Sequence, residues 1–280
     1  MRLYENEAKR VFEREGIAVP RAAGVFERAE DIGPAVGAGA PVMLKSLVLI
    51  GGRGKAGGVR RAVGGAEAAA LAADMLGRRI RGYPVERLLV EEAVEATGAA
   101  YVGVTMNPAD FNVTVIVSPA GGVDIEQVAR EAPAKILRIE LAGNDACLPE
   151  PEAARLAGFL AAGLPGGEAQ TRALKEIVSR VYAAFQKYDC KVAEINPLLL
   201  TKAGPVAADA KIVLDDNGLY RQGGLFELLG LSMPRHDVSE PTPNELRARE
   251  AGFKYVDLLP PDHVKDPSKL YVGLVPGGAG

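Results

Sequence analysis

The sequence contains few of the residues on which several classes of protein depend. It has no tryptophan, two histidines and two cysteines, and Cys147 and Cys190 lie far apart with no CxxC spacing. Two such cysteines are expected to be reduced thiols, which argues against a disulfide scaffold and a cysteine-rich metal site. His236 and His263 stand in proline-rich, polar surroundings, so neither is expected to be a metal ligand or a catalytic base.

The sequence also lacks a strong net charge and a long apolar run. Its formal net charge is −3 over 280 residues, which argues against nucleic acid as the main partner. No apolar segment approaches the length of a membrane span, and the charged residues 1–14 contain no apolar signal core. We therefore expect no membrane association and a cytoplasmic, reducing location.

The apolar residues that are present follow patterns that predict interleaved helices and strands. Helices are predicted at residues 4–16, 66–76, 124–131, 152–164, 168–187 and 244–251. Strands are predicted at residues 41–50, 88–92, 100–106, 113–118, 191–200, 205–214 and 270–275, with a short extended piece at 17–20 and a surface linker at 234–243. This order indicates α/β or α+β subdomains that enclose a cleft, and the length allows two of them.

Glycine is abundant, and it is concentrated in residues 51–58, which read Gly-Gly-Arg-Gly-Lys-Ala-Gly-Gly. Glycines let a backbone approach a ligand closely and direct successive N–H groups toward it. Arg53 and Lys55 add positive charge that suits a polyphosphate. The segment has neither the Walker spacing nor the GxGxxG order of dinucleotide-binding folds. On glycine content alone, a solvated surface loop explains it equally well.

Lys45 lies in an apolar strand six residues before this loop. A buried ammonium group needs an anionic partner, and a phosphate oxygen would serve. The alternative is an edge position with the side chain in solvent. Lys45 and the loop together favour a nucleotide site. The predicted strand at 88–92 ends in two glutamates, which could accept hydrogen bonds from a base or a ribose, although many strands end in this way.

A second group of polar residues lies on the last two strands predicted before residue 215. Alternation places Glu194 and Asn196 on one face, and Asp209 comes from the neighbouring strand. Amide and carboxylate oxygens are ligands that Mg²⁺ takes when substrate phosphates complete its shell. The alternative is a solvated outer face on an edge strand, which Pro197 would permit. We favour the metal site because it needs the same ligand as the glycine-rich loop.

Four segments resemble the β subunit of succinyl-CoA synthetase and its malate–CoA ligase and citryl-CoA synthetase relatives. They are GGRGKAGGV at residues 51–59 with the preceding Lys45, AGGVDIEQVAREAP at 120–133, AEINPLLLTK at 193–202 and DAKIVLDDNGLYR at 209–221. The resemblance runs from residue 1 to about residue 255. It implies an ATP-grasp fold for residues 1–240, with ATP held between two subdomains.

The resemblance also assigns roles to residues at matching positions. Phosphate contacts fall on Lys45, Gly52, Arg53 and Gly54, and other nucleotide contacts fall on Glu91, on the adenosine side, and Val94. Magnesium ligands fall on Asn196 and Asp209. Glu194 matches a glutamate that helps to position a phosphorylated histidine, so Glu194, Arg53 and Lys45 are the catalytic candidates. Pro20 matches ATP-type rather than GTP-type subunits.

The reaction that the resemblance implies has three steps. Mg-ATP phosphorylates a histidine of an α-type subunit, the phosphate passes to a carboxylate, and CoA displaces it to give an acyl-CoA. Succinate is the expected acid, within the tricarboxylic acid cycle. The α-type subunit would carry both the histidine and the CoA site, which agrees with the two unpromising histidines in this chain.

The chain departs from the family pattern in several places. Ala99 stands where the family usually has a glutamate, and residues 47–50 are more apolar than in the family. The segment at 255–274 is longer. Residues 241–280 are expected to be a linker and the first strand of a flavodoxin-like C-terminal ligase domain that the sequence lacks. A truncated protein, a split subunit completed in trans and a naturally reduced protein all fit this ending.

Two other functions stay open. Malate or citrate could replace succinate, because the acid-binding contacts of the family lie beyond Gly280. Ala99 and the early ending also fit a non-catalytic nucleotide-binding or scaffolding module. An unrelated ATP-grasp ligase is disfavoured, because several specific segments agree in order. A component that works with an α subunit and a separate ligase domain, and that is inactive without them, is the leading hypothesis.

Overall fold

The computed structural model describes residues 1–107, 112–142, 145–231, 244, 247–248 and 251. The chain divides into two compact units, residues 1–239 and residues 240–280. All that follows concerns the first unit. The linker predicted at 234–243 and the strand predicted at 270–275 lie outside the described residues, as does most of the helix predicted at 244–251.

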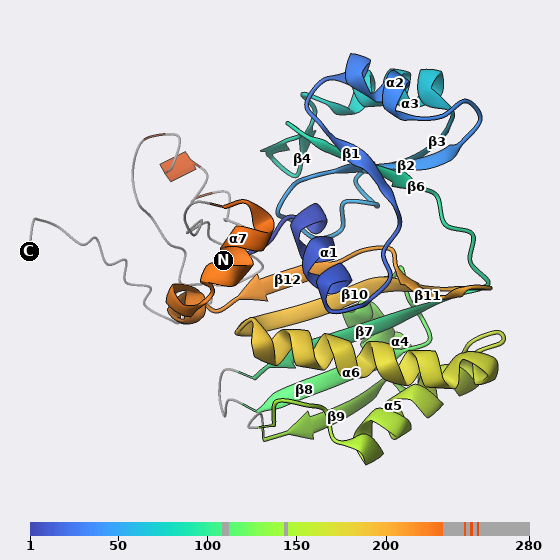
Figure 1. Ribbon diagram of the computed structural model, residues 1–280, viewed down its shortest axis with the longest axis vertical. Coiled ribbons are helices and arrows are strands. Elements are labelled where there is room, and N and C mark those ends of the chain that lie inside the picture. Colours follow the sequence, from blue (N-terminus) through green and yellow to red (C-terminus); the bar gives the residue numbers. More distant parts are fainter. Residues whose placement is uncertain (108–111, 143–144, 232–243, 245–246, 249–250, 252–280) are drawn as a thin grey trace, which may run out of the picture. The chain divides into compact units, whose positions relative to one another are not determined.

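The first unit contains seven α-helices and twelve strands within its described residues (Figure 1). The helices are α1 Glu5–Arg14, α2 Ile32–Ala35, α3 Gly65–Met75, α4 Ile125–Glu131, α5 Glu150–Gly163, α6 Thr171–Lys187 and α7 Gly223–Leu229. The strands are β1 Ala22–Phe26, β2 Pro41–Ser46, β3 Val59–Val63, β4 Arg79–Ile80, β5 Tyr83–Pro84, β6 Leu88–Glu92, β7 Gly98–Met106, β8 Val113–Ser118, β9 Leu137–Leu141, β10 Cys190–Thr201, β11 Gly204–Ala207 and β12 Lys211–Leu214.

One sheet has four antiparallel strands in the order β1-β6-β2-β3. Its central strands β2 and β6 are mostly buried, and Leu44 and Val90 pack in a core that also contains Ala68 and Ala72 of α3. Figure 1 shows α2 and α3 covering one face of this sheet. The opposite face is therefore the one on which polar side chains of β2 and β6 can meet a ligand.

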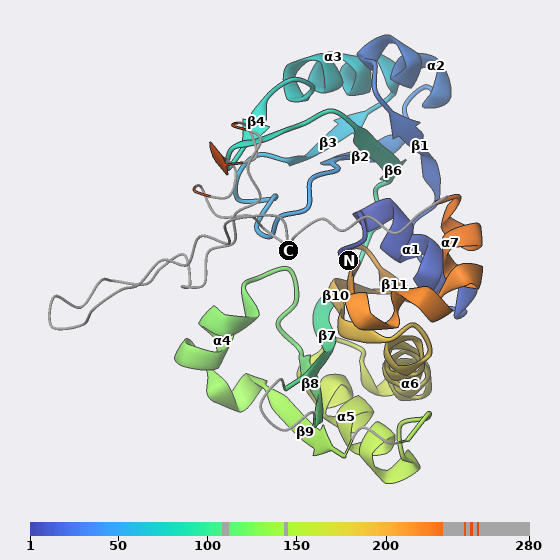
Figure 2. The ribbon, with the colours of Figure 1, turned by 90° about the vertical axis from the view of Figure 1, so that its left-hand side faces the viewer.

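The second sheet has six strands, with β11-β10-β7-β8-β9 in a row and β12 also paired with β10. Helices α5 and α6 cover one face and bury Leu156, Leu160, Val178 and Val181 against the strands. In Figure 2, α4 lies on the other side of this sheet from α6. The face opposite α5 and α6 is the one left for polar residues of β10.

Helix α1 begins where Glu7 accepts a hydrogen bond from the backbone N–H of Tyr4, at 2.9 Å, a capping contact that satisfies a free N–H group. Its face carries Val11 and Phe12 into the second core. The same helix buries Glu5 and Lys9, two charged side chains that are almost never fully buried without a partner. Within the described residues, no helix is long and apolar enough to cross a membrane.

The sequence predicted most elements with the correct type but misjudged several strands. The strands predicted at 88–92 and 113–118 have the predicted bounds, and the strand predicted at 41–50 ends at Ser46. The single strand predicted at 205–214 is wrong, because β11 and β12 are separate and residues 208–210 connect them. The strands β1, β3, β4, β5 and β9 and the helices α2 and α7 were not predicted, and residues 17–20 belong to no strand. Both Cys147 and Cys190 are free thiols, as predicted.

Candidate functional site

A pocket of about 810 Å³ is lined by residues from β2, β6, β10, the glycine-rich loop and the segment between β11 and β12. Nine residues named from the sequence all line it: Lys45, Gly52, Arg53, Gly54, Glu91, Val94, Glu194, Asn196 and Asp209. Pro20 lines it as well, whereas Ala99 does not. The structure thus brings together residues separated by more than 150 positions in the chain.

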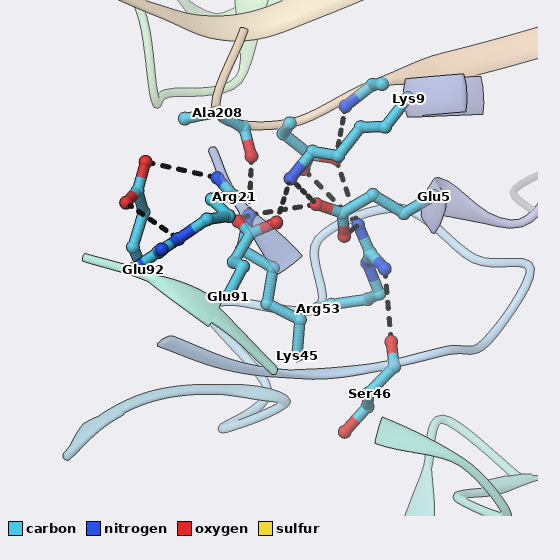
Figure 3. Close-up of polar contacts among 11 residues, drawn as sticks. Glu5, Lys9, Arg21, Lys45, Ser46, Arg53, Glu91, Glu92 and Ala208 are labelled. Atoms are coloured by element: carbon cyan, nitrogen blue, oxygen red, sulfur yellow. Dashed lines mark hydrogen bonds and ion pairs between the residues drawn. The ribbon is translucent and has the colours of Figure 1, made fainter. Parts of the chain in front are cut away.

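Lys45 is a buried residue of β2, so the alternative of a solvent-exposed edge position is wrong. Its ammonium group lies 2.8 Å from Glu5 Oε1 and 2.7 Å from Glu91 Oε1, and it also donates to the carbonyl oxygen of Ala208 (Figure 3). An ammonium group has three N–H donors. All three are therefore engaged by protein acceptors in this structure.

Arg53, from the glycine-rich loop, is fixed in the same network. Its guanidinium donates to Glu5 Oε2 at 2.7 Å, to Asp209 Oδ1 at 3.1 Å and to the carbonyl oxygen of Ser46 at 3.1 Å. Its side chain is 10% exposed. A planar guanidinium with several fixed partners is well suited to a defined oxyanion geometry.

Glu5 and Lys9 belong to this network, and the sequence reasoning missed both. Glu5 contacts Lys45, Arg53 and Lys9, and Lys9 also lies 2.6 Å from Glu91. We call Glu5, Lys9, Lys45, Arg53, Glu91 and Asp209 the charged cluster. A signal was available, because Glu5 and Lys9 share a helical face with Ala8 and Phe12, which is where core residues belong.

The charged cluster contains three carboxylates and three cations, so it is electrically balanced. Burial alone would raise the pKa of Glu5, but Lys45, Lys9 and Arg53 hold it well below its usual range. Burial opposes the charge on Lys45, but Glu5 and Glu91 keep its pKa above the usual value. Burial lowers the pKa of Lys9, which Glu5 only partly offsets. Each charge is thus maintained by its neighbours inside a poorly solvated site.

The glycine-rich loop folds back on itself and leaves part of its backbone available. The N–H groups of Ala56, Gly57 and Gly58 donate to carbonyl oxygens within the loop. In the described part of the chain, the N–H groups of Gly52 and Gly54 donate to no protein acceptor. Gly52 has a φ of 70°, a left-handed conformation that favours glycine. The loop can therefore present backbone donors to an anion.

Glu194 of β10 is half-buried and lines the pocket. It pairs across the sheet with Gly103 of β7 and Lys211 of β12. The hydroxyl group of buried Tyr101 donates to Glu194 Oε2 at 3.4 Å, and the Tyr101 ring occupies the space that a side chain at Gly103 would need. Burial raises the pKa of Glu194, and Asp209 adds to the effect.

Asn196 and Asp209 supply oxygen atoms of the type that Mg²⁺ binds. Asn196 Oδ1 accepts from the N–H of Gly122 at 2.7 Å and keeps a second lone pair, while Nδ2 donates to the carbonyl of Val123. Among the described residues, no group of three or more His, Cys, Asp or Glu could hold a metal without other ligands. A donor set of this kind fits a cation whose shell is completed by phosphate oxygens.

These features define a protein of the ATP-grasp class. The sequence matches the ATP-grasp domain family over residues 2–200, so the chain belongs to that family. The structure is similar to a dinucleotide-forming acetyl-coenzyme A synthetase of Ca. Korarchaeum cryptofilum, with a TM-score of 0.59 and 19% identity, over 76% of this chain and 93% of that one. It is also similar to the ATP citrate lyase of Methanothrix soehngenii, with a TM-score of 0.55 and 18% identity, over 89% and 59%.

Curated proteins that share higher sequence identity with this chain than those two structures are named succinate–CoA ligase subunits. The ADP-forming subunit beta 2 of Archaeoglobus fulgidus is 36% identical, and the ADP-forming subunit beta of Halobacterium salinarum is 39% identical. The GDP-forming subunit beta of Thermus thermophilus is 37% identical. In each case the match covers 92% of this chain and 65% of the relative. The chain thus spans slightly less than two thirds of the length of these relatives.

Proposed function

We propose that this chain is the nucleotide-binding, β-type component of an ADP-forming carboxylate–CoA ligase, in which Mg-ATP phosphorylates a histidine of an α-type subunit. The observation that carries the proposal is the convergence of nine residues, named from sequence alone, on one pocket. The similarity to succinate–CoA ligase β subunits supports succinate as the acid and residues 1–240 as the ATP-grasp part.

The charged cluster would bind the nucleotide by exchanging partners. Lys45 has no donor left, so a phosphate oxygen would have to replace an acceptor such as the Ala208 carbonyl. Arg53 would keep Glu5 and give up Asp209, whose carboxylate would then be free to bind a cation. Such exchange keeps each group paired, which avoids the cost of a buried unpaired charge.

Asn196 and Asp209 would hold Mg²⁺, which when bound with the nucleotide offsets phosphate charge. Lys45, Arg53 and the N–H groups of Gly52 and Gly54 would orient the phosphates. Glu91 and Val94 would contact the nucleoside. Pro20, which lines the pocket, would favour adenine over guanine, although one relative is named GDP-forming.

Glu194 would position the partner's histidine. A glutamate whose pKa is raised by burial can accept a hydrogen bond from an imidazole N–H and fix its tautomer. That leaves the other ring nitrogen directed at the transferred phosphate. The role needs no covalent change in Glu194 itself, so it is one of orientation and charge.

Malate or citrate as the acid, and a non-catalytic nucleotide-binding module, are the alternatives. Ala99 supports the module, because it removes a glutamate that the related sequences usually carry. The catalytic proposal is favoured over the module because Glu194, Asn196 and Asp209 are all present and line the pocket.

The test is transfer of labelled phosphate from γ-labelled ATP to an α-type subunit that co-purifies with the tagged chain. We expect an acid-labile, alkali-stable label on the partner, and a loss of about a hundredfold or more in the Glu194→Gln variant, the lower end of a typical general acid–base contribution. A partner that stays unlabelled while the chain binds Mg-ATP would contradict the catalytic proposal and leave the module as the better account.

A further inference from the structure

A short hairpin packs directly over the glycine-rich loop. Strands β4 and β5 pair Ile80 with Tyr83, which leaves Arg81 and Gly82 as a two-residue turn. Ile80 is buried, and its Cδ1 lies only 2.6 Å from where a Cβ on Gly58 would be. Gly58 therefore lets the hairpin come into close contact with the loop, and this contact fixes where the turn lies.

Arg81 occupies a backbone conformation that arginine does not favour. Its φ is 49° and that of Gly82 is 90°. Two-residue hairpin turns with positive φ at both positions strongly prefer Asn-Gly or Asp-Gly, because other L-residues are strained there. Strained residues cluster at functional sites, where the surrounding structure maintains them. The strain at Arg81 is a reason to look for what its side chain does.

The guanidinium group of Arg81 lies against Gly52. Its Nη2 atom is 3.1 Å from the position that a Cβ on Gly52 would take, and both residues line the pocket. In the part of the chain that the structure describes, no hydrogen bond or ion pair engages the Arg81 side chain. Lys45 and Arg53, in contrast, are already paired with carboxylates. Arg81 thus offers an uncommitted cation beside the free N–H groups of the loop.

We infer that Arg81 is a further phosphate-binding residue, which contacts the polyphosphate part of the nucleotide as it approaches the N–H of Gly52. This inference rests on the proposed nucleotide site. Arginine pairs well with phosphate through parallel N–H donors, and a contact at the pocket edge requires no carboxylate to be displaced first. Arg81 would therefore engage the nucleotide before Lys45 and Arg53 exchange their partners.

The test compares the 280-residue chain with its Arg81→Asn and Arg172→Asn variants. Asparagine tolerates the left-handed turn, so the first variant removes the cation without disturbing the hairpin. Arg172 lies on α6 with a side chain that is 91% exposed and is not in the pocket lining, so the second variant matches the loss of charge. The ligands are Mg-ATP, inorganic tripolyphosphate and adenosine, titrated calorimetrically, and thermal unfolding is recorded for each protein.

For Arg81→Asn we expect about tenfold weaker binding of Mg-ATP and of tripolyphosphate, which is the effect of losing one charge-assisted contact. Adenosine binding and the melting temperature should not fall, and Arg172→Asn should match the wild type. Unchanged Mg-ATP affinity in Arg81→Asn would refute the role of Arg81 while leaving the nucleotide site intact. If adenosine binding weakened equally, or if the melting temperature fell, the phosphate-binding role of Arg81 would be refuted and a structural role indicated. A wild-type chain that binds neither phosphate ligand would overturn both proposals.

Discussion

Glu5 is the residue on which the charged cluster depends most. Its carboxylate contacts Lys9, Lys45 and Arg53 at 2.7–2.9 Å, and its side chain is 1% exposed. Replacing one partner in a buried ion network is costly because the remaining charges lose their compensation. Glu5 lines the pocket itself and holds in place Lys45 and Arg53, the two cations that we propose bind phosphate.

We predict that Glu5→Gln lowers the free energy of unfolding by about 3–5 kcal/mol at pH 7, because three buried cations lose their common counter-charge. Urea denaturation followed by circular dichroism measures this. The control is Asp31→Asn, which removes the partner of Arg28 in an exposed ion pair and should lower stability far less than Glu5→Gln. Equal effects of the two substitutions would contradict the account of Glu5.

The same variant has a defined pH dependence. The folded-state pKa of Glu5 is depressed well below 4.5 by its three cations, despite burial. A carboxylate of this kind contributes stability above its unfolded pKa, and the contribution is lost as the pH falls through the folded pKa. The difference in unfolding free energy between wild type and Glu5→Gln should therefore be constant near neutrality and shrink below about pH 4.5. A difference in unfolding free energy that increases as the pH falls would contradict this account of Glu5.

At the scale of elements, the pairing of β7 with β10 positions Glu194 beside a residue that has no side chain. Gly103 lies opposite Glu194, and a Cβ there would come within 2.4 Å of the Tyr101 hydroxyl oxygen. We predict that Gly103→Ala destabilises the fold by about 1–3 kcal/mol through overpacking. It should also reduce phosphate transfer to the partner while Mg-ATP affinity stays unchanged, because Tyr101 would leave Glu194. A Gly103→Ala protein with normal stability and transfer would contradict this packing.

The control for that prediction is Gly158→Ala in α5, where nothing lies within 4 Å of an added Cβ. An alanine in a helix interior is favoured over glycine by about 1 kcal/mol. Gly158→Ala should therefore keep or raise stability, and a comparable loss in both variants would indicate a general effect of the methyl group.

The elements that contribute residues to the pocket were predicted from the sequence better than the strands at the edges of the sheets. The glycine-rich loop, Lys45 and the two polar residues of β10 have strong local signals, and all of them line the pocket. Strand β3 contains Arg60 and Arg61 and was missed because it lacks a clean alternation of apolar and polar residues. Segment 205–214 was predicted as one strand, and only long-range pairing with β10 separates β11 from β12.

Tertiary contacts decided what local patterns could not. A phosphate oxygen was expected to be the anionic partner of Lys45, yet Glu5 of α1 and Glu91 of β6 already pair with it. No local pattern links three segments that are 40 residues or more apart. Asp209 was expected within a strand, but it lies in the connection after β11, where it reaches Arg53. The roles of these residues toward nucleotide and metal stay predictions.

At the scale of the molecule, the pocket joins residues of both sheets through Asp209. This carboxylate is 38% exposed, and Arg53 would keep Glu5 and the Ser46 carbonyl as partners without it, so removal of Asp209 should leave the fold intact. We predict opposite effects of Asp209→Ala on two ligands. Mg-ATP should bind about tenfold more weakly, because a metal ligand is lost. Metal-free ATP should bind as well as before or better, because Arg53 loses its competing carboxylate. Weakening of both ligands to the same extent would contradict the metal assignment.

The most direct test of the account is calorimetric titration of the purified 280-residue chain with ATP and with GTP, each with and without Mg²⁺. The charged cluster, the free N–H groups of the glycine-rich loop and the oxygen donors Asn196 and Asp209 predict saturable, Mg²⁺-dependent binding of ATP, with much weaker binding of GTP. No heat of binding for either nucleotide, under conditions in which the chain is folded, would contradict the assignment of this pocket as a nucleotide site.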